Sequence, residues 1–222
     1  MELMRGIVMR ITEVDSCGCL LDAGGRCIVT SGFVSVAVEE QIESGEEFLI
    51  KNADGDLCFN QRSPDILKGY NVNIELCQVD PELIGLLTDV TLEEADTDTV
   101  GFRPELGKID RHFALEVWTR VGGTACADEG ELFGYLLIPH LTGGVLKGMT
   151  VENGPVSFSV EGAYTVATDC WGVGPYPVIE VLGEPAPLED PLETTQPWLL
   201  RTTPVEPPAV AAITDCVYPT PL

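Results

Sequence analysis

The stretch Tyr70–Val90, YNVNIELCQVDPELIGLLTDV, decides the fold because its hydrophobic period changes at a single point. In its first half, apolar residues alternate with polar ones, and Val72, Ile74 and Leu76 fall on the same face. This period of two predicts a strand that buries one face and exposes the other. The alternation ends just before Asp80.

The second half of the stretch predicts a short helix. Asp80 is a favoured N-cap, and Pro81 suits the first helical position because the missing amide would be unpaired there anyway. Glu82 places a negative charge at the helix N-terminus, where it is stabilising. Apolar residues then follow at i, i+3, i+4 and i+7, namely Leu83, Leu86, Leu87 and Val90. This spacing predicts an apolar stripe that docks on a sheet.

Further strands are expected on both sides of this stretch. Residues 6–14 and 26–38 precede it, and residues 111–121, 133–140 and 156–168 follow it, all rich in strand-forming residues. Little else in the chain has a helical pattern. We therefore predict a mainly β fold over residues 1–177, a β-sandwich or partial barrel with one short flanking helix.

A projecting hairpin is predicted near residues 47–60. Its turn is Asp54-Gly55-Asp56, because Asp-Gly is a strong hairpin signal. An acidic break over residues 39–47 is expected to precede the hairpin.

The composition changes near the C-terminus. Eleven of the 16 prolines lie between Pro175 and Pro221, and proline cannot donate to a sheet ladder. We predict an extended arm over residues 178–222, outside the core. Its apolar patch, Trp198, Leu199 and Leu200, is expected to contact a groove on a neighbour, and a disordered tail is the alternative. Deleting the arm is expected to leave a folded domain that assembles poorly.

The charge and cysteine content exclude several classes. The chain has 222 residues, 36 of them acidic and 12 basic, for a net charge of −24. Such acidity repels phosphates and argues against nucleic-acid binding through a basic patch. No apolar stretch approaches the ~20 residues of a membrane helix, and no secretory signal is evident. The eight cysteines are expected to be buried free thiols, with disulfides left open.

No catalytic constellation is present, so we expect a protein that is not an enzyme and needs no cofactor. His112 and His140 are expected to be structural, and neither a nucleophile elbow nor a phosphate-binding loop occurs. Cys17, Cys19 and Cys27 come nearest to a metal cluster but lack the spacing of a zinc site. The acidic residues 92–99 predict a solvated loop, with a hard-cation site as the weaker alternative.

Three segments carry a resemblance to a known family. They are NVNIELCQVDPELIGLLTD, GFRPELGKIDRHFALEVWTRV and VSFSVEGAYTVATDCWGVGPYPV, which together span roughly residues 70–178. In pattern they resemble the tail tube (major tail) protein of long-tailed siphophages, of the kind found in phages of actinobacteria. The resemblance implies a virion protein, assembled in the host cytoplasm, that forms hexameric rings stacked into a hollow tube. Double-stranded DNA would be cargo only, the other partners would be phage tail proteins, and no membrane would be involved.

The resemblance also implies roles for particular residues. Lumen-facing candidates are Glu116, Arg120, Ser157, Ser159 and Glu161, since an acidic lumen would let DNA slide past without binding. The hairpin tip at Asp54, Gly55 and Asp56 would reach the next ring. Stacked acidic rings repel one another, so some contacts must be apolar, basic or cation-bound.

Two other protein classes remain open. One is a neck, capsid-decoration or other phage binding protein that clamps a partner with the proline-rich arm. The other is a secreted, disulfide-bonded carbohydrate-binding sandwich.

Overall fold

The computed structural model describes residues 3–21, 25–78, 80–96, 98–121, 132–148, 157–166, 176, 178–188 and 192–215. Among these residues it forms one short helix and many antiparallel strands, which confirms the mainly β class. The strands are β1 (Leu3–Glu13), β2 (Arg26–Thr30), β3 (Phe33–Glu43), β4 (Glu47–Lys51), β5 (Leu57–Arg62), β6 (Ile66–Leu76), β7 (Val90–Ala95), β8 (Asp98–Pro104), β9 (His112–Val121), β10 (Phe133–Thr142), β11 (Val145–Leu146), β12 (Phe158–Thr165), β13 (Ile179–Val181), β14 (Glu184–Ala186), β15 (Leu199–Thr203) and β16 (Ala211–Asp215). The helix, α1 (Pro81–Leu87), lies between β6 and β7.

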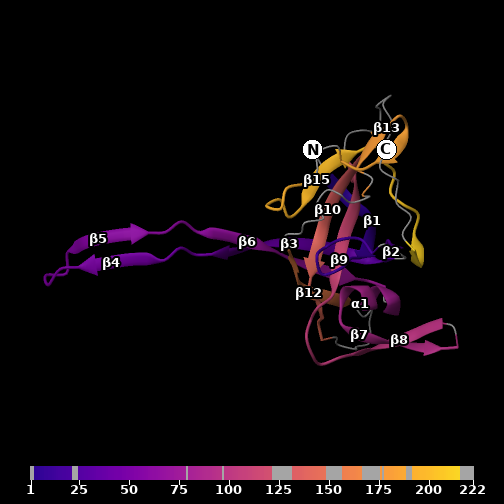
Figure 1. Ribbon diagram of the computed structural model, residues 1–222, viewed down its shortest axis with the longest axis horizontal. Coiled ribbons are helices and arrows are strands. Elements are labelled where there is room, and N and C mark those ends of the chain that lie inside the picture. The colour runs from indigo at the N-terminus through magenta and orange to yellow at the C-terminus, as the bar shows by residue number, and fades with distance from the viewer. Residues whose placement is uncertain are drawn as a thin grey trace.

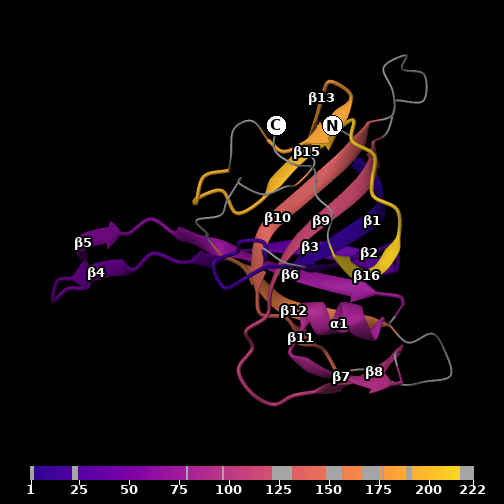
Figure 2. The ribbon, with the colours of Figure 1, turned by 45° about the vertical axis from the view of Figure 1, so that its right-hand side comes forward.

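One large antiparallel sheet organises the molecule. Its strands lie in the order β16-β2-β1-β9-β10-β12-β6-β3, with β11 beside β12 and β15 beside β10. The hairpins β4-β5, β7-β8 and β13-β14 form separate two-stranded sheets. The large sheet curls so that β3 and β6 face β1 and β9 across an apolar core (Figures 1 and 2). The architecture is therefore a partial barrel made from one curled sheet.

Helix α1 begins where the sequence predicts. The Asp80 side chain is the N-cap and accepts a hydrogen bond from the Glu82 amide at 3.0 Å. Pro81 takes the first helical position, where it costs no hydrogen bond. The buried side chains include the predicted stripe, Leu83, Leu86 and Leu87. The helix ends where the Thr88 hydroxyl donates to the Ile84 carbonyl at 2.8 Å, and its apolar side packs into the core between the two halves of the sheet.

The other face of the β1-β9-β10 region is covered by residues 176 and 178–188 of the same chain. An apolar cluster fills this contact, with Trp118 and Tyr135 from the sheet and Tyr176 and Val178 from the covering segment. The β13-β14 hairpin in this segment is closed by a hydrogen bond from the Val178 amide to the Ala186 carbonyl at 3.0 Å. Both faces of β9 are therefore buried along most of its length.

The predicted C-terminal arm is extended, but it does not stand apart from the domain. β15 pairs with the first half of β10, and β16 pairs with β2. Thr203 and Val205 are buried, so the expectation that the region after residue 178 lies outside the core is wrong for these parts. The prolines at 197, 204, 207 and 208 fall outside β15 and β16, where they remove no ladder hydrogen bond.

A bulge in β10 explains why this strand runs past Pro139. The register of β10 against β9 shifts between Ile138 and Leu141, and Pro139 lies inside the shift. A proline is tolerated at a bulge because no ladder donor is needed there. The strand therefore continues to Thr142, beyond the predicted end at residue 140.

A second bulge changes the alternation of β12. Its register against β6 shifts between Val160 and Ala163, and Gly162 between them has a φ of 79°. A residue in this left-handed region is usually glycine. Beyond the bulge the predicted faces are exchanged, so Ala163 is buried and Tyr164 is exposed.

Two predicted loops are strands. Residues 39–47 were expected to break the chain, but β3 continues to Glu43 and pairs there with Ile66 of β6. Residues 92–99 were expected to be a solvated loop, but they belong to the β7-β8 hairpin, where Glu93 forms an ion pair with Arg103. Strand pairing outweighs the low strand propensity of these acidic residues.

The cysteines differ from the expected buried thiols. Cys19 and Cys27 are disulfide-bonded, whereas Cys17, Cys58 and Cys77 are free and exposed. The other three cysteines, at positions 126, 170 and 216, lie outside the described residues. Because a disulfide sulfur is not a thiolate ligand, Cys17, Cys19 and Cys27 cannot together form a metal site.

Candidate functional site: assembly surfaces

The hairpin β4-β5 projects far from the body, as predicted (Figure 1). Its turn is organised by the Asn52 side chain, whose Oδ1 accepts from the amides of Asp54 at 3.1 Å and Asp56 at 2.7 Å. Gly55 has a φ of 88°, which glycine adopts without strain. The tip therefore consists of Asp54, Gly55 and Asp56, and it presents two exposed carboxylates.

The base of the hairpin is held by polar contacts. The Gly45 amide donates to Oδ1 of Asp65 at 2.8 Å, and Nη2 of Arg62 donates to the same oxygen at 3.0 Å. The hydrogen bond from Gly45, followed by that from Arg62, lowers the pKa of Asp65. These contacts connect the segment before β4 to the segment after β5 at the base of the hairpin.

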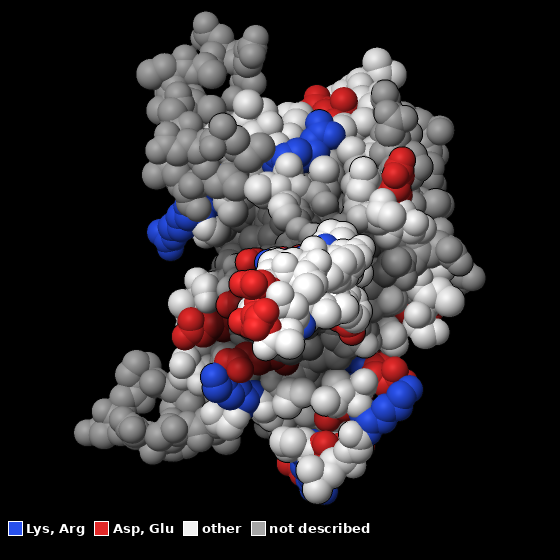
Figure 3. Space-filling view, turned by 90° about the vertical axis from the view of Figure 1, so that its left-hand side faces the viewer, with Lys and Arg blue, Asp and Glu red and all other residues white. Residues whose placement is uncertain are grey.

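The hairpin exposes an apolar surface. Ile50 lies directly opposite Phe59, and Phe48 lies two residues before Ile50 on the same face. Their exposed fractions are 59%, 45% and 53% for Ile50, Phe59 and Phe48 respectively. Figure 3 looks toward the body along the hairpin, and the projecting lobe is mostly uncharged beside acidic side chains. An isolated two-stranded hairpin is marginally stable in water. An exposed apolar surface of this kind is typical of a site that binds a partner.

The strands β3, β6, β11 and β12 present a polar face to solvent. On β6 the predicted alternation is confirmed, with Val72, Ile74 and Leu76 buried in the core. The opposite face carries polar side chains from β3, β6 and β12 and from residues directly next to β11 and β12. They include Ser35, Asn73, Glu75, Lys147, Ser157, Ser159 and Glu161. Lys147 is paired with Glu161 at 2.6 Å. Three of the five predicted lumen residues, Ser157, Ser159 and Glu161, therefore share one face of one sheet.

Glu116 does not belong to this polar face. It is fully buried on β9, beneath the segment 176–188, so it cannot line a lumen. The assignment to a solvated face is wrong because the sequence does not reveal that covering segment. Arg120 is exposed but lies near Arg5 and Phe33, away from the three other residues.

Glu116 is the centre of a buried polar network. The Arg10 guanidinium forms a two-point ion pair with it, through Nε and through Nη2 at 2.7 Å. The Tyr135 hydroxyl donates to Oε1 of Glu116 at 2.6 Å. Burial, and then the Glu116 charge, raise the pKa of Tyr135 well above its ordinary value. The network satisfies the polar groups of three side chains, and satisfied networks of this kind rigidify a core.

His112 and His140 lie together near the β10 bulge. Nδ1 of His112 is 2.9 Å from Nε2 of His140. Burial, followed by the proximity of His112, lowers the pKa of His140 from 6.5 to about 4. Oδ1 of Asp110 lies 3.5 Å from Nε2 of His112. The pair lies at the edge of the core.

The apolar patch of the predicted arm packs on the protein's own body. The Trp198 ring meets Tyr70 of β6 edge-on, with ring centroids 5.8 Å apart. Leu199 packs against the cluster beneath residues 176–188, and Leu200 remains 42% exposed. Trp198 and Leu199 therefore pack on this chain, and Leu200 pairs with Leu136 of β10. Contact of this patch with a neighbour stays a prediction.

The described residues contain no group of three or more His, Cys, Asp or Glu side chains placed to hold a metal ion. Within the same ranges, no helix has the length and apolarity needed to cross a bilayer. No protein-family model matches the chain, and no match was found among curated proteins.

Proposed function

We propose that this protein is a structural subunit of a virion, which polymerises as stacked hexameric rings into the tail tube of a long-tailed phage. The observation that carries the proposal is the projecting hairpin, whose apolar side chains are about half exposed to solvent. Phe48, Ile50 and Phe59 lie far from the core of the monomer, so they can be buried only by contact with another molecule, which in the tube is another copy. In the tube, the hairpin bridges neighbouring rings.

The polar face of β3, β6, β11 and β12 supports the same proposal. The inner side of these strands is core, and the outer side carries serine, asparagine and glutamate side chains together with Lys147, whose charge is paired with Glu161. In a closed ring this face lines a water-filled channel. Uncharged polar and acidic groups there do not bind DNA phosphates, so DNA moves through as cargo.

An open sheet edge supplies a means of ring closure. β3 is the last strand in the order of the large sheet, and β6 is its strand neighbour. An exposed edge strand templates pairing with another chain, and closing a ring removes that edge. The edge and the polar face belong to the same four strands, so pairing at β3 also extends the channel wall.

A neck or decoration protein is a weaker alternative. That function needs a free proline-rich arm to clamp a partner, and β15 and β16 belong to the protein's own sheet. The disulfide bonds of Cys19 and Cys27 are compatible with a virion, which works outside the cell.

Light scattering over a range of concentrations tests the proposal, because the mass of the particles shows whether the purified protein assembles. A matched variant replaces residues 44–65 with an Asn-Gly turn, which joins β3 directly to β6. The wild-type protein is expected to form large particles, and the shortened variant is expected to stop at a single ring or a monomer. A wild-type protein that stays monomeric at every concentration contradicts the proposal.

A further inference from the structure

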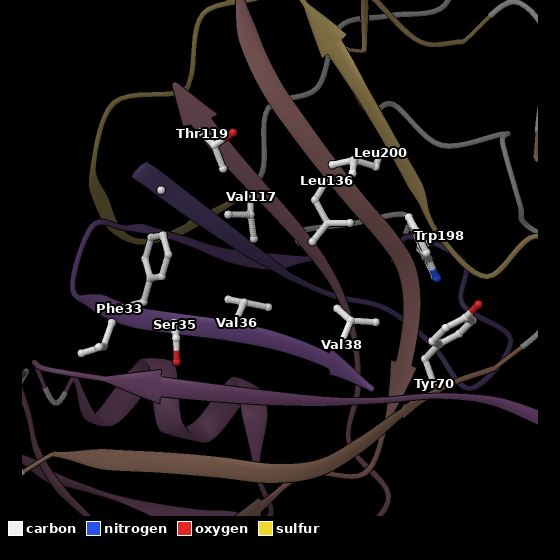
Figure 4. A pocket seen from close by; sticks show the side chains of 12 residues that line it. Phe33, Ser35, Val36, Val38, Tyr70, Val117, Thr119, Leu136, Trp198 and Leu200 are labelled. Atoms are coloured by element: carbon white, nitrogen blue, oxygen red, sulfur yellow. The ribbon is translucent and has the colours of Figure 1, made fainter. Parts of the chain in front are cut away.

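An apolar groove lies beside the open edge of β3. It has a volume of about 520 Å³. Phe33, Val36 and Val38 point into it from β3, toward Val117 and Leu136 on the facing half of the sheet (Figure 4). Trp198 closes one end. A groove of this size and lining accepts several apolar side chains.

A second hollow, which we call the arginine pocket, continues the groove. It has a volume of about 680 Å³, and Gly6, Phe33 and Val34 line both cavities. Arg5 and Arg120 complete its wall. The two cavities form one continuous surface that is apolar at one end and basic at the other.

Most basic side chains in this acidic chain form ion pairs, but within the described ranges the two arginines of the pocket do not. Of the chain's 12 basic residues, eight form ion pairs with acidic side chains, namely Arg10, Arg26, Arg62, Lys68, Arg103, Lys108, Arg111 and Lys147. The described residues show no such pair for the other four, Arg5, Lys51, Arg120 and Arg201, although acidic residues outnumber basic ones threefold. Of these four, Arg5 and Arg120 line the same pocket. A guanidinium left unpaired in this setting is suited to bind a carboxylate from another molecule.

The hairpin complements the two cavities in the same order, with an apolar stem for the apolar groove and an acidic tip for the arginine pocket. Its stem presents Phe48, Ile50 and Phe59, and its tip presents Asp54 and Asp56. It points away from the body, so it cannot reach its own groove (Figures 1 and 2). A second copy of the chain can bring its hairpin there.

We propose that the groove and the arginine pocket are the receptor for the hairpin of a second copy. Apolar stem residues fill the groove, and the two tip carboxylates pair with Arg5 and Arg120. The contact joins two different surfaces, so it repeats from copy to copy and propagates an assembly. This inference rests on the proposed function, and it assigns the contact that offsets the repulsion between acidic copies.

Charge reversal tests the pairing. The variants Asp54→Arg/Asp56→Arg and Arg5→Glu/Arg120→Glu are each expected to raise the concentration needed for assembly at least about tenfold, which is ~1.4 kcal/mol. The four substitutions combined restore the wild-type net charge and are expected to restore assembly. The control, Arg103→Glu/Lys108→Glu, makes the same charge change on exposed side chains elsewhere and is expected to assemble like the wild type.

A crosslink tests whether the hairpin of one copy lies in the groove of another. Cys58 is a free, exposed thiol on the hairpin, and Val34 is 55% exposed where the two cavities meet. A short bis-maleimide is expected to join Val34→Cys to Cys58 of another copy and give a ladder of multimers. Both variants also carry Cys17→Ser and Cys77→Ser, which remove the other free, exposed thiols of the described residues. In this background Val34→Cys/Cys58→Ser is expected to give no ladder.

The outcomes separate the two proposals. If the wild type assembles but the charge variants assemble equally well, or the crosslink is absent, the receptor assignment is wrong and the tube proposal stands. If combining the four substitutions restores nothing, the receptor assignment is also wrong. If the wild type does not assemble at all, the proposed function itself fails.

Discussion

Arg10 on β1 holds Glu116 on β9 in a two-point ion pair, although 106 positions separate them in the chain. Both residues are buried, and a cover of C-terminal residues excludes water from them. The pair explains how an acidic residue occupies a core strand, because the charge is neutralised where it is desolvated.

Breaking this pair should destabilise the fold. Glu116→Gln leaves the Arg10 guanidinium buried without a counter-charge, which costs about 3–5 kcal/mol. At about 2–4 °C for each kcal/mol, the melting temperature should fall by roughly 6–20 °C. The matched control is Arg10→Met/Glu116→Gln, which keeps an acceptor for the Tyr135 hydroxyl. This double variant should lose less stability than the sum of the two single variants, and strict additivity would show that the pair is not coupled.

The buried His140 should make stability depend on pH. Its pKa is about 4 in the folded protein and 6.5 in the unfolded chain, so the unfolded state binds the proton more readily. Its contribution is therefore complete above pH 6.5 and declines as the pH falls toward 4. At about 1.36 kcal/mol per pKa unit, the loss is at most roughly 3 kcal/mol.

Denaturant unfolding at pH 7.5 and pH 4.5 measures this effect. The wild type should lose more stability between the two conditions than His140→Gln, by about 2–3 kcal/mol. Equal losses in the two proteins would show that His140 does not titrate in this way.

The covering segment 176–188 should be essential for folding, contrary to what the sequence alone predicts. Without it, Trp118 and Tyr135 become exposed, and each aromatic side chain buries about 150–250 Å². At about 25 cal/mol per Å², the loss of roughly 7–12 kcal/mol approaches the whole stability of a typical domain. A chain that ends before Tyr176 should therefore not fold cooperatively.

A point substitution makes the same test without truncation. Val178 is 1% exposed and Leu182 is 99% exposed. Val178→Asp should cost at least about 3 kcal/mol because it buries an unpaired charge. Leu182→Asp should change stability by less than about 0.5 kcal/mol. Similar melting temperatures for the two variants would mean that the segment does not cover the sheet.

The angle of the hairpin should depend on Gly45. A Cβ atom at this position would lie 1.9 Å from the Ser63 carbonyl oxygen, so Gly45→Ala must displace the backbone at the hairpin base. Assembly should be lost in light scattering, while the unfolding free energy of the body changes by less than about 1 kcal/mol. Gly107 has open space around it, and Gly107→Ala should assemble normally. Normal assembly of Gly45→Ala would mean that the hairpin angle is not important.

Local patterns predicted the local elements well. The Asp80-Pro81 cap, the alternation of β6 and the Asp54-Gly55 turn each depend on neighbouring residues, and the structure has all three. These features follow from short-range sterics and hydrogen bonding, which a sequence displays directly.

Long-range contacts account for what the sequence analysis missed. The burial of Glu116 depends on Arg10 and on residues 176–188, and no periodicity connects these three parts of the chain. The bulge at Gly162 shifts one strand face by one residue, and such a shift exchanges the two faces. The groove depends on the curl of the whole sheet, so neither the groove nor the placement of Arg5 and Arg120 in one pocket has a local signal.

Negative-stain electron microscopy of the concentrated protein is the decisive experiment for the tail tube proposal. Hollow tubes or stacked rings of uniform diameter are expected, with a central channel visible in end views. Uniform monomeric particles, or filaments without a channel, would contradict the proposal.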